Sequence, residues 1–181
     1  MSSNQPSQSK AKSSIDTAAI RAAAKNLDDG AVTAGYQGNR QEIIDLLNGA
    51  LATELVCVMR YKRHYFTVTG RENIAVKAEF LQHAQEEEGH ADQIAERIVQ
   101  LNGEPDFNPA SLTERSHAEY DDSSDVQAMV RANLIAERVA IESYRQMIEK
   151  IGDSDPTTRQ MLIGIMAVEE EHADDMKDFL S

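Results

Sequence analysis

Residues 83–105 have the sequence HAQEEEGHADQIAERIVQLNGEP, in which Glu87 stands three positions before His90. The same Glu-x-x-His spacing recurs at Glu169 and His172, 82 residues later (169 − 87 = 82). Residues three apart lie on one face of a helix, so each pair can present a carboxylate and an imidazole to a single metal ion. A duplicated Glu-x-x-His pattern is typical of a two-metal site inside a four-helix bundle.

A lone glutamate precedes each pair at nearly the same interval, Glu54 before Glu87 (87 − 54 = 33) and Glu137 before Glu169 (169 − 137 = 32). Both have Leu and Val neighbours at helical spacing, so we expect buried carboxylates. Four buried carboxylates that converge would repel one another strongly. Two divalent cations would resolve this repulsion, and the mixed carboxylate and imidazole donors suit iron, manganese or zinc. The alternative, salt bridges on a solvated face, does not explain the repeat.

Two tyrosines repeat with the same internal symmetry. Tyr61 follows Glu54 by seven residues, and Tyr144 follows Glu137 by seven. Seven residues make about two helical turns, so each tyrosine shares a face with its glutamate. Each hydroxyl could therefore hydrogen-bond a ligand carboxylate. Core packing with a satisfied hydroxyl explains the two tyrosines equally well.

The sequence supports a role in metal binding less strongly for the other histidines and for the cysteine. His83 lies four residues before Glu87, where it could contact metal that enters or leaves the centre, although a surface or core role is commoner. Cys57 follows Glu54 by three residues and is interpreted as a small core residue. The sequence gives no assignment for His64.

Two further matches to the pattern are set aside. Glu114 and His117 have the Glu-x-x-His spacing, but no lone glutamate precedes them at the right interval, so we interpret this match as chance. Glu86 lies four residues before His90, whereas the equivalent position of the second pair is Val168. Glu86 is therefore expected to be solvated or to face a cavity.

Apolar residues at helical spacing predict four long helices, at residues 40–69, 71–102, 124–151 and 156–180. Short connections make the first two and the last two antiparallel hairpins. The connection at residues 103–123 could extend over ~70 Å, and a 30-residue helix is ~45 Å long. It can therefore cross the bundle, and residues 109–120 could add a helical turn within it. The expected fold class is all-α, a four-helix bundle with one long crossover.

The composition fits one domain of a soluble protein. The bundle would occupy residues 40–181, preceded by an extension at residues 1–39, with residues 1–14 disordered and a short helix at 15–27. The net charge of −13 attracts cations and repels nucleic acid. A single cysteine fits a reducing cytoplasm, and no apolar run approaches the ~18 residues of a membrane span.

The E-x-x-H-A-D core and the I-x-x-L-x-G-x-P ending of residues 83–105 resemble helix B of bacterioferritins, and residues 54–61, 134–144 and 169–172 resemble their other helices. The resemblance covers about residues 40–180 and implies a ferritin-like bundle with a catalytic di-iron ferroxidase centre. In that centre Glu54 and His90 would bind one iron, Glu137 and His172 the other, and Glu87 and Glu169 would bridge the two ions.

Several features of this sequence differ from bacterioferritins and indicate a related family instead. Glu88 stands where bacterioferritins have their haem-ligating Met, so no haem is expected. Only nine residues follow His172 (181 − 172 = 9), too few for the fifth helix of the 24-subunit shells. The chain therefore looks more like the bacterioferritin-related, Dps-like mini-ferritins, and a homo-oligomeric cage of 12 subunits is favoured over 24. The cysteine pair of their thioferritin members is absent, because Cys57 stands alone.

The function that this resemblance implies is iron storage and detoxification. Fe(II) would be oxidised by hydrogen peroxide or dioxygen and stored as an Fe(III) mineral. One alternative is a di-iron or di-manganese peroxidase, catalase or oxygenase without storage. Another is a DNA-protecting Dps-type protein, although true Dps proteins place their iron site between subunits. Residues 1–27 carry a net charge of +3 and the remainder −16 (−13 − 3 = −16), a weak basis for binding DNA.

Overall fold

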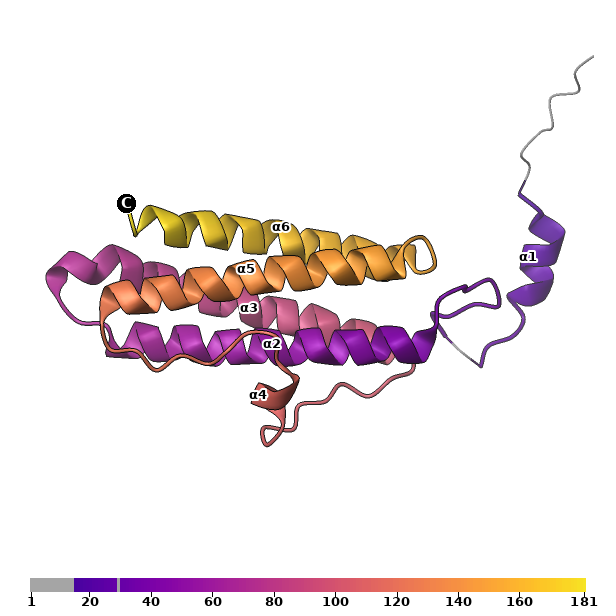
Figure 1. The fold of residues 1–181 in the computed structure, drawn as a ribbon. Helices are drawn as coiled ribbons and strands as arrows, with labels where there is room; N and C mark the ends of the chain where they lie inside the picture. Colours follow the sequence, from indigo (N-terminus) through magenta and orange to yellow (C-terminus); the bar gives the residue numbers. More distant parts are fainter. Residues whose placement is uncertain (1–14, 29) are drawn as a thin grey trace, which may run out of the picture.

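The computed structural model describes residues 15–28 and 30–181, so the expected disordered arm at residues 1–14 lies outside the described residues. Every regular element in the described ranges is a helix, which confirms the all-α prediction (Figure 1). The elements are α1 (Thr17–Ala23), α2 (Arg40–Thr67), the 3-10 helix η1 (Arg71–Asn73), α3 (Ile74–Gln100), α4 (Leu112–Arg115), α5 (Val126–Ile151) and α6 (Pro156–Asp178).

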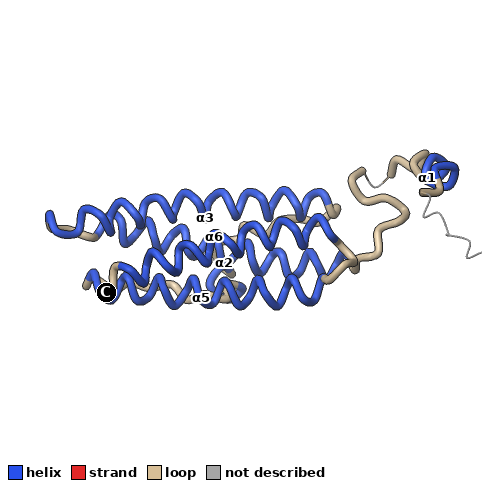
Figure 2. The backbone as a smooth tube through the Cα atoms, turned by 90° about the horizontal axis from the view of Figure 1, so that it is seen from above, coloured by secondary structure: helices blue, strands red, loops and turns tan. Residues whose placement is uncertain are grey.

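The four long helices form one bundle, in which α2 packs along α3 and α5 packs along α6 (Figures 1 and 2). The long connection between α3 and α5 runs along the outside of the bundle and contains α4. Leu112 of α4 packs against Ala52 and Val56 of α2, which fixes this connection to the bundle. The predicted topology of two hairpins joined by a long crossover is therefore confirmed.

Helix ends differ from the predicted bounds for local reasons. α2 ends at Thr67, where Val68 turns to an extended backbone, and α3 begins at Ile74 rather than at residue 71, after Gly70 with φ +99°. That left-handed backbone cannot continue a helix, and a 3-10 turn follows it instead. α5 begins two residues later than expected because the Asp125 carboxylate accepts a hydrogen bond from the Ala128 N–H at 2.9 Å and caps the helix there.

A buried ionic cluster fixes one end of the bundle. The Asp155 carboxylate caps α6 by accepting a hydrogen bond from the Thr158 N–H at 2.9 Å. Arg97 of α3 donates to both of its oxygens, at 2.9 and 3.0 Å, and Tyr36 donates at 2.9 Å. Burial opposes ionisation of Asp155, but the hydrogen bonds from Thr158 and Arg97 outweigh it and lower the pKa. The cluster joins the segment before α2 to α3 and α6.

Two apolar clusters fill the bundle on either side of a polar middle. One contains Leu47, Leu51, Ile94 and Leu162 among others, and the second contains Phe80, Met129 and Met176. Between them along each helix lie fully buried carboxylates and imidazoles. None of the described helices is long and apolar enough to cross a membrane. The fold therefore encloses charged groups that need partners.

Candidate metal centre

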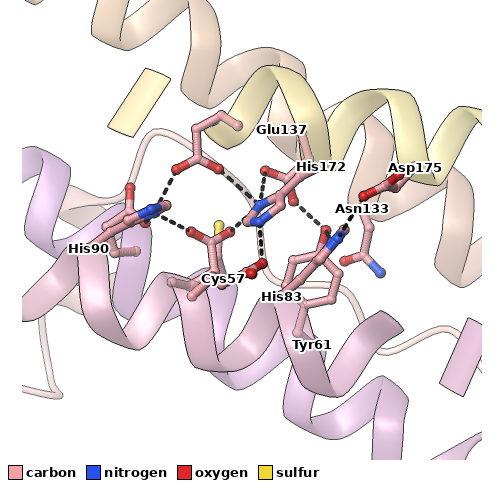
Figure 3. Close-up of polar contacts among 12 residues, drawn as sticks. Cys57, Tyr61, His83, His90, Asn133, Glu137, His172 and Asp175 are labelled. Carbon is pink, nitrogen blue, oxygen red and sulfur yellow. Dashed lines mark hydrogen bonds and ion pairs between the residues drawn. The ribbon is translucent and has the colours of Figure 1, made fainter. Parts of the chain in front are cut away.

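The six predicted ligands meet in the middle of the bundle, one or two from each long helix, and Figure 3 labels His90, Glu137 and His172 among them. All are at most 5% exposed. Their donor atoms fall into two groups, each within 4.8 Å: Glu54, Glu87, His90 and Glu169 in one, and Glu87, Glu137, Glu169 and His172 in the other. Glu87 and Glu169 belong to both groups. The structure thus brings together all six side chains that the sequence singled out.

The two histidines mark two adjacent positions. His90 Nδ1 lies 2.9 Å from Glu169 Oε1 and 3.3 Å from Glu87 Oε2. His172 Nδ1 lies 3.3 Å from Glu169 Oε2 and 3.9 Å from Glu87 Oε1. Each of the two shared carboxylates therefore turns one oxygen toward each histidine. This is the arrangement in which a carboxylate bridges two metal ions.

The terminal carboxylates complete the two positions. Glu54 Oε2 lies 3.5 Å from His90 Nδ1, and Glu137 Oε2 lies 3.9 Å from His172 Nδ1. Each of these glutamates gives its other oxygen to a tyrosine hydroxyl: Tyr144 donates to Glu54 Oε1, and Tyr61 donates to Glu137 Oε1. One oxygen of each terminal glutamate is thus held by a tyrosine, and the second is available to a metal.

The tyrosine contacts are crossed relative to the sequence. Tyr61 shares a helix face with Glu54, but its hydroxyl reaches Glu137 on α5. Tyr144 follows Glu137, but its hydroxyl reaches Glu54 on α2. Both tyrosines therefore link α2 to α5, and burial together with the adjacent carboxylate raises the pKa of each hydroxyl well above its usual value.

Unpaired buried atoms provide a test of whether metal ions fit. Among the described residues, six ligand atoms are buried without a hydrogen-bond partner: Glu54 Oε2, Glu87 Oε1, Glu137 Oε2, both Glu169 oxygens and His172 Nδ1. Leaving such atoms unpaired in a protein interior is costly. Each of the five carboxylate oxygens lies within 3.9 Å of the Nδ1 of His90 or His172, so two divalent cations with oxygen and nitrogen donors would satisfy these atoms.

The electrostatics follow from four carboxylates buried with two imidazoles. Burial and the neighbouring Glu169 raise the pKa of Glu137 to about 8 and that of Glu87 well above its usual range. Burial opposes protonation of the histidines, but Glu169 helps to outweigh it, and the pKa rises to about 10 for His90 and about 9 for His172. Burial opposes ionisation of Glu169, but both imidazoles outweigh it and lower its pKa to about 2.

Glu86 was expected to be solvated or to face a cavity, and its side chain is 39% exposed, but its contact with a candidate ligand was not predicted. His172 Nε2 donates to Glu86 Oε2 at 2.8 Å, so Glu86 orients the ring and leaves Nδ1 toward the bridging carboxylates. The asymmetry with Val168 hid this role, because only one half of the site has such a carboxylate. The adjacent Glu88 is exposed and pairs with Lys62 at 3.2 Å.

Arg60 is a buried cation beside the site that the sequence analysis missed. It is 0% exposed, and its guanidinium lies 4.0 Å from Glu137 Oε1. It donates to Asn133 Oδ1 at 2.8 Å and to Cys57 Sγ at 3.3 Å. An arginine one turn after the apolar Val56 and Cys57 was the available signal. Cys57 is buried, as expected for a core residue, and it is in neither ligand group.

Two other histidines, His64 and His117, lie apart from the six ligands. His64, which the sequence left unassigned, is buried between Asn133 and Asp121, with ring nitrogens 3.1 Å from each. His117 lies in the crossover, where its backbone N–H donates to Thr53, and no described group of potential metal ligands includes it or Glu114. The third Glu-x-x-His match is therefore outside the site.

Comparison with known proteins agrees with this geometry. Residues 44–181 match the family model of the ferritin-like domain. A nutrient stress-induced DNA-binding protein of Synechococcus sp. is 30% identical over 77% of this chain and 81% of its own length. A DNA protection during starvation protein of Mycolicibacterium smegmatis is 29% identical over 76% of this chain and 73% of its own.

A solved structure has a similar fold and a similar sequence. It is described as a dodecameric thioferritin, the bacterioferritin-related protein of Bacteroides fragilis. It is 34% identical, with a TM-score of 0.76 over 80% of this chain and 87% of that one. The predicted resemblance to bacterioferritin-related and Dps-like proteins is thus confirmed.

Proposed function

The chain belongs to the ferritin-like family, and within that family we propose that it is a ferroxidase that stores iron. Each subunit takes up Fe(II) between the six buried ligands, and hydrogen peroxide or dioxygen oxidises it. The Fe(III) is then stored as mineral inside a homo-oligomeric cage. Iron is the substrate and the cargo of this reaction.

One observation carries the proposal. Glu87 and Glu169 each turn one oxygen toward His90 and the other toward His172, within a single subunit. Two ions held by shared carboxylates would lie close enough to deliver two electrons to one oxidant. With peroxide, two Fe(II) ions each lose one electron, the O–O bond breaks, and two protons complete two water molecules. Fe(II) and peroxide are consumed together, so they cannot form hydroxyl radical.

The chain's own residues bind and orient the iron in this scheme. Tyr144 and Tyr61 fix the terminal carboxylates Glu54 and Glu137, so each turns one oxygen toward the metal positions. Glu86 fixes the His172 ring. The apolar clusters on both sides hold the four helices in place, which sets the separation of the two metal positions.

The experiment compares Fe(II) oxidation by the intact protein with that of Glu54→Ala and His90→Ala, followed by absorbance after Fe(II) and peroxide are mixed. Both variants should lose rapid oxidation and remain helical by circular dichroism. Glu88→Ala is the matched control, because it removes an exposed glutamate next to Glu87 and should oxidise at the normal rate. Unchanged oxidation in both ligand variants would refute the site.

Assembly and iron content separate storage from a discrete enzyme. The Bacteroides fragilis relative is described as dodecameric, which supports a cage of 12 subunits here. Light scattering should give the mass of about 12 chains of 20.1 kDa, and an assembled particle should retain many irons per subunit. A dimer with two metals per subunit would instead indicate a peroxidase, catalase or oxygenase.

DNA protection is the second candidate, favoured by the names of two relatives. Lys10 and Lys12 lie outside the described residues, and the chain carries −13 overall. A gel-shift experiment at low and high salt, with and without residues 1–14, tests it. Binding that requires these residues and weakens steeply with salt would support this function. The absence of a shift at low salt would exclude it.

A further inference from the structure

A second group of potential ligands lies beside the dinuclear centre. Glu79 and His83 are one turn apart on α3, and Asp175 faces them from α6. His83 Nε2 lies 3.3 Å from Glu79 Oε1 and 3.5 Å from Asp175 Oδ2. The imidazole is 0% exposed, whereas the two carboxyl side chains are 26% and 41% exposed. The group therefore lies between solvent and the buried centre, and Figure 3 shows His83 and Asp175 close together beside His172.

Hydrogen bonding fixes the tautomer of His83. The Tyr61 hydroxyl donates its hydrogen to Glu137 Oε1. His83 Nδ1 lies 3.1 Å from the same hydroxyl oxygen, so Nδ1 carries a hydrogen and donates it. In the neutral ring, Nε2 then has a lone pair and no hydrogen. This nitrogen lies 3.3 Å from Glu79 Oε1 and 3.5 Å from Asp175 Oδ2.

Three acceptors thus face one another without a donor between them. His83 Nε2 is buried and has no hydrogen-bond partner among the described residues. Burial and the neighbouring Asp175 raise the pKa of Glu79, as expected where negative charges crowd together. A cation at the centre of the group would turn the repulsion into three ligand bonds. An imidazole and two carboxylates are donors that Fe(II), Mn(II) and Zn(II) accept.

We propose that Glu79, His83 and Asp175 form a third metal site, which binds one divalent cation beside the dinuclear centre. The site shares no residue with the six ligands of that centre. Its two carboxylates are accessible from outside, so it is a staging site for a cation on its way into or out of the bundle. The identification of this cation as Fe(II) rests on the proposed ferroxidase function. The proposal that the site binds a divalent cation does not depend on that function.

A charged His83 without metal is the competing explanation. A doubly protonated ring would form charge-assisted hydrogen bonds to both carboxylates, and such bonds are about 2.7–2.9 Å long. The separations of 3.3 and 3.5 Å are longer. The His83 ring also stacks on His172, with ring centres 3.9 Å apart, where a second positive charge would be repelled. The neutral ring therefore fits the geometry better.

The third site is joined to the dinuclear centre by direct contacts. His83 donates to Tyr61, and Tyr61 donates to Glu137, a terminal ligand of the second metal position. The stacked ring of His172 belongs to the same position. A cation at Glu79 and Asp175 would therefore be one imidazole ring away from the centre that it supplies.

The test counts metal ions on the metal-free full-length protein. Calorimetric titration with Zn(II) should give three tight sites per subunit. Glu79→Gln combined with Asp175→Asn should give two, because it removes both carboxylates and leaves the six central ligands intact. Glu88→Gln combined with Asp174→Asn is the matched control; it neutralises two exposed acids on the same two helices and should retain three sites.

The same titration separates this inference from the proposed function. Glu54→Ala with His90→Ala should lose central sites and keep the third. In a crystal of the Zn(II)-loaded protein, an anomalous peak should lie about 2.0–2.2 Å from His83 Nε2 and the two carboxylates. Two sites in the unmodified protein, or three in the Glu79→Gln/Asp175→Asn variant, would overturn the third site. Slow iron oxidation with three sites present would overturn the ferroxidase proposal alone.

Discussion

Loading the metal-free centre with two divalent cations should release protons, and the structure gives their number. Four buried groups have a raised pKa: His90 at about 10, His172 at about 9, Glu137 at about 8, and Glu87 well above its usual value. At pH 7 these pKa values leave both histidines ~99% and Glu137 ~90% protonated. Each group must lose its proton to bind metal.

The expected release is therefore about three protons per subunit, and about four when Glu87 contributes. Two divalent cations carry the same charge as four protons, so the exchange leaves the net charge of the buried site unchanged. That equality matters because an uncompensated charge in the interior is costly. The apparent metal affinity should fall as the pH is lowered below 7, since protons compete more effectively. The number released should decline as the pH rises from 8 to 10.

The assay is calorimetric titration with Zn(II) at pH 7 in two buffers of different protonation enthalpy, which yields the proton count directly. The Glu79→Gln/Asp175→Asn variant restricts the count to the dinuclear centre. His172→Ala should release about one proton fewer. A release below two protons per two metals, with both ions bound, would refute the reasoning, because at most one of His90, His172 and Glu137 would then carry a proton without metal.

Three further outcomes are expected. Tyr144→Phe leaves a Glu54 oxygen without its donor and should weaken metal binding at the dinuclear centre by ~10–100-fold. Tyr61→Phe should do the same and should also weaken metal binding at the third site. Equal effects of the two variants on the third site would contradict the contact between Tyr61 and His83. Asp155→Ala leaves Arg97 buried without its carboxylate and should lower the free energy of unfolding by ~3–5 kcal/mol in urea titrations, against little change for the exposed control Asp153→Ala. The metal-free protein should lose stability as the pH rises through 9 and 10, because His172 and His90 bind protons more tightly in the folded state. The stabilisation by these protons is complete only below pH ~6.5, the pKa of histidine in the unfolded chain. Protein loaded with Zn(II) should not show this loss of stability.

Much of the fold followed from local sequence signals. Helical spacing and short turns predicted the four long helices, and the length of the α3–α5 connection predicted the crossover. The errors lay at helix ends, where single residues decide. Val68 turns to an extended backbone and ends α2, and Asp125 sets the start of α5 by its cap. Apolar periodicity is insensitive to such features, because it averages over several turns.

The six candidate ligands were predictable because the pattern occurs twice. Glu87 and His90 alone would have been one match among several, as Glu114 and His117 illustrate. The nearly equal intervals to Glu54 and Glu137 singled out the two pairs that the bundle brings together. Residues that occur in only one half of the duplicated pattern could not be recognised in this way. Arg60 and Glu86 have no counterpart in the other half, so duplication could not reveal them.

The sequence by itself determined which side chains face the interior of each helix, and therefore which residues are available to the centre. The tertiary structure alone decided which of them meet. Tyr61 reaches Glu137 and Tyr144 reaches Glu54, and His83 faces Asp175 across the α3–α6 interface. The physical reason is that helical periodicity fixes the direction of a side chain around its own axis. It does not fix how far one helix is shifted along another, and that shift is set by packing of the whole bundle.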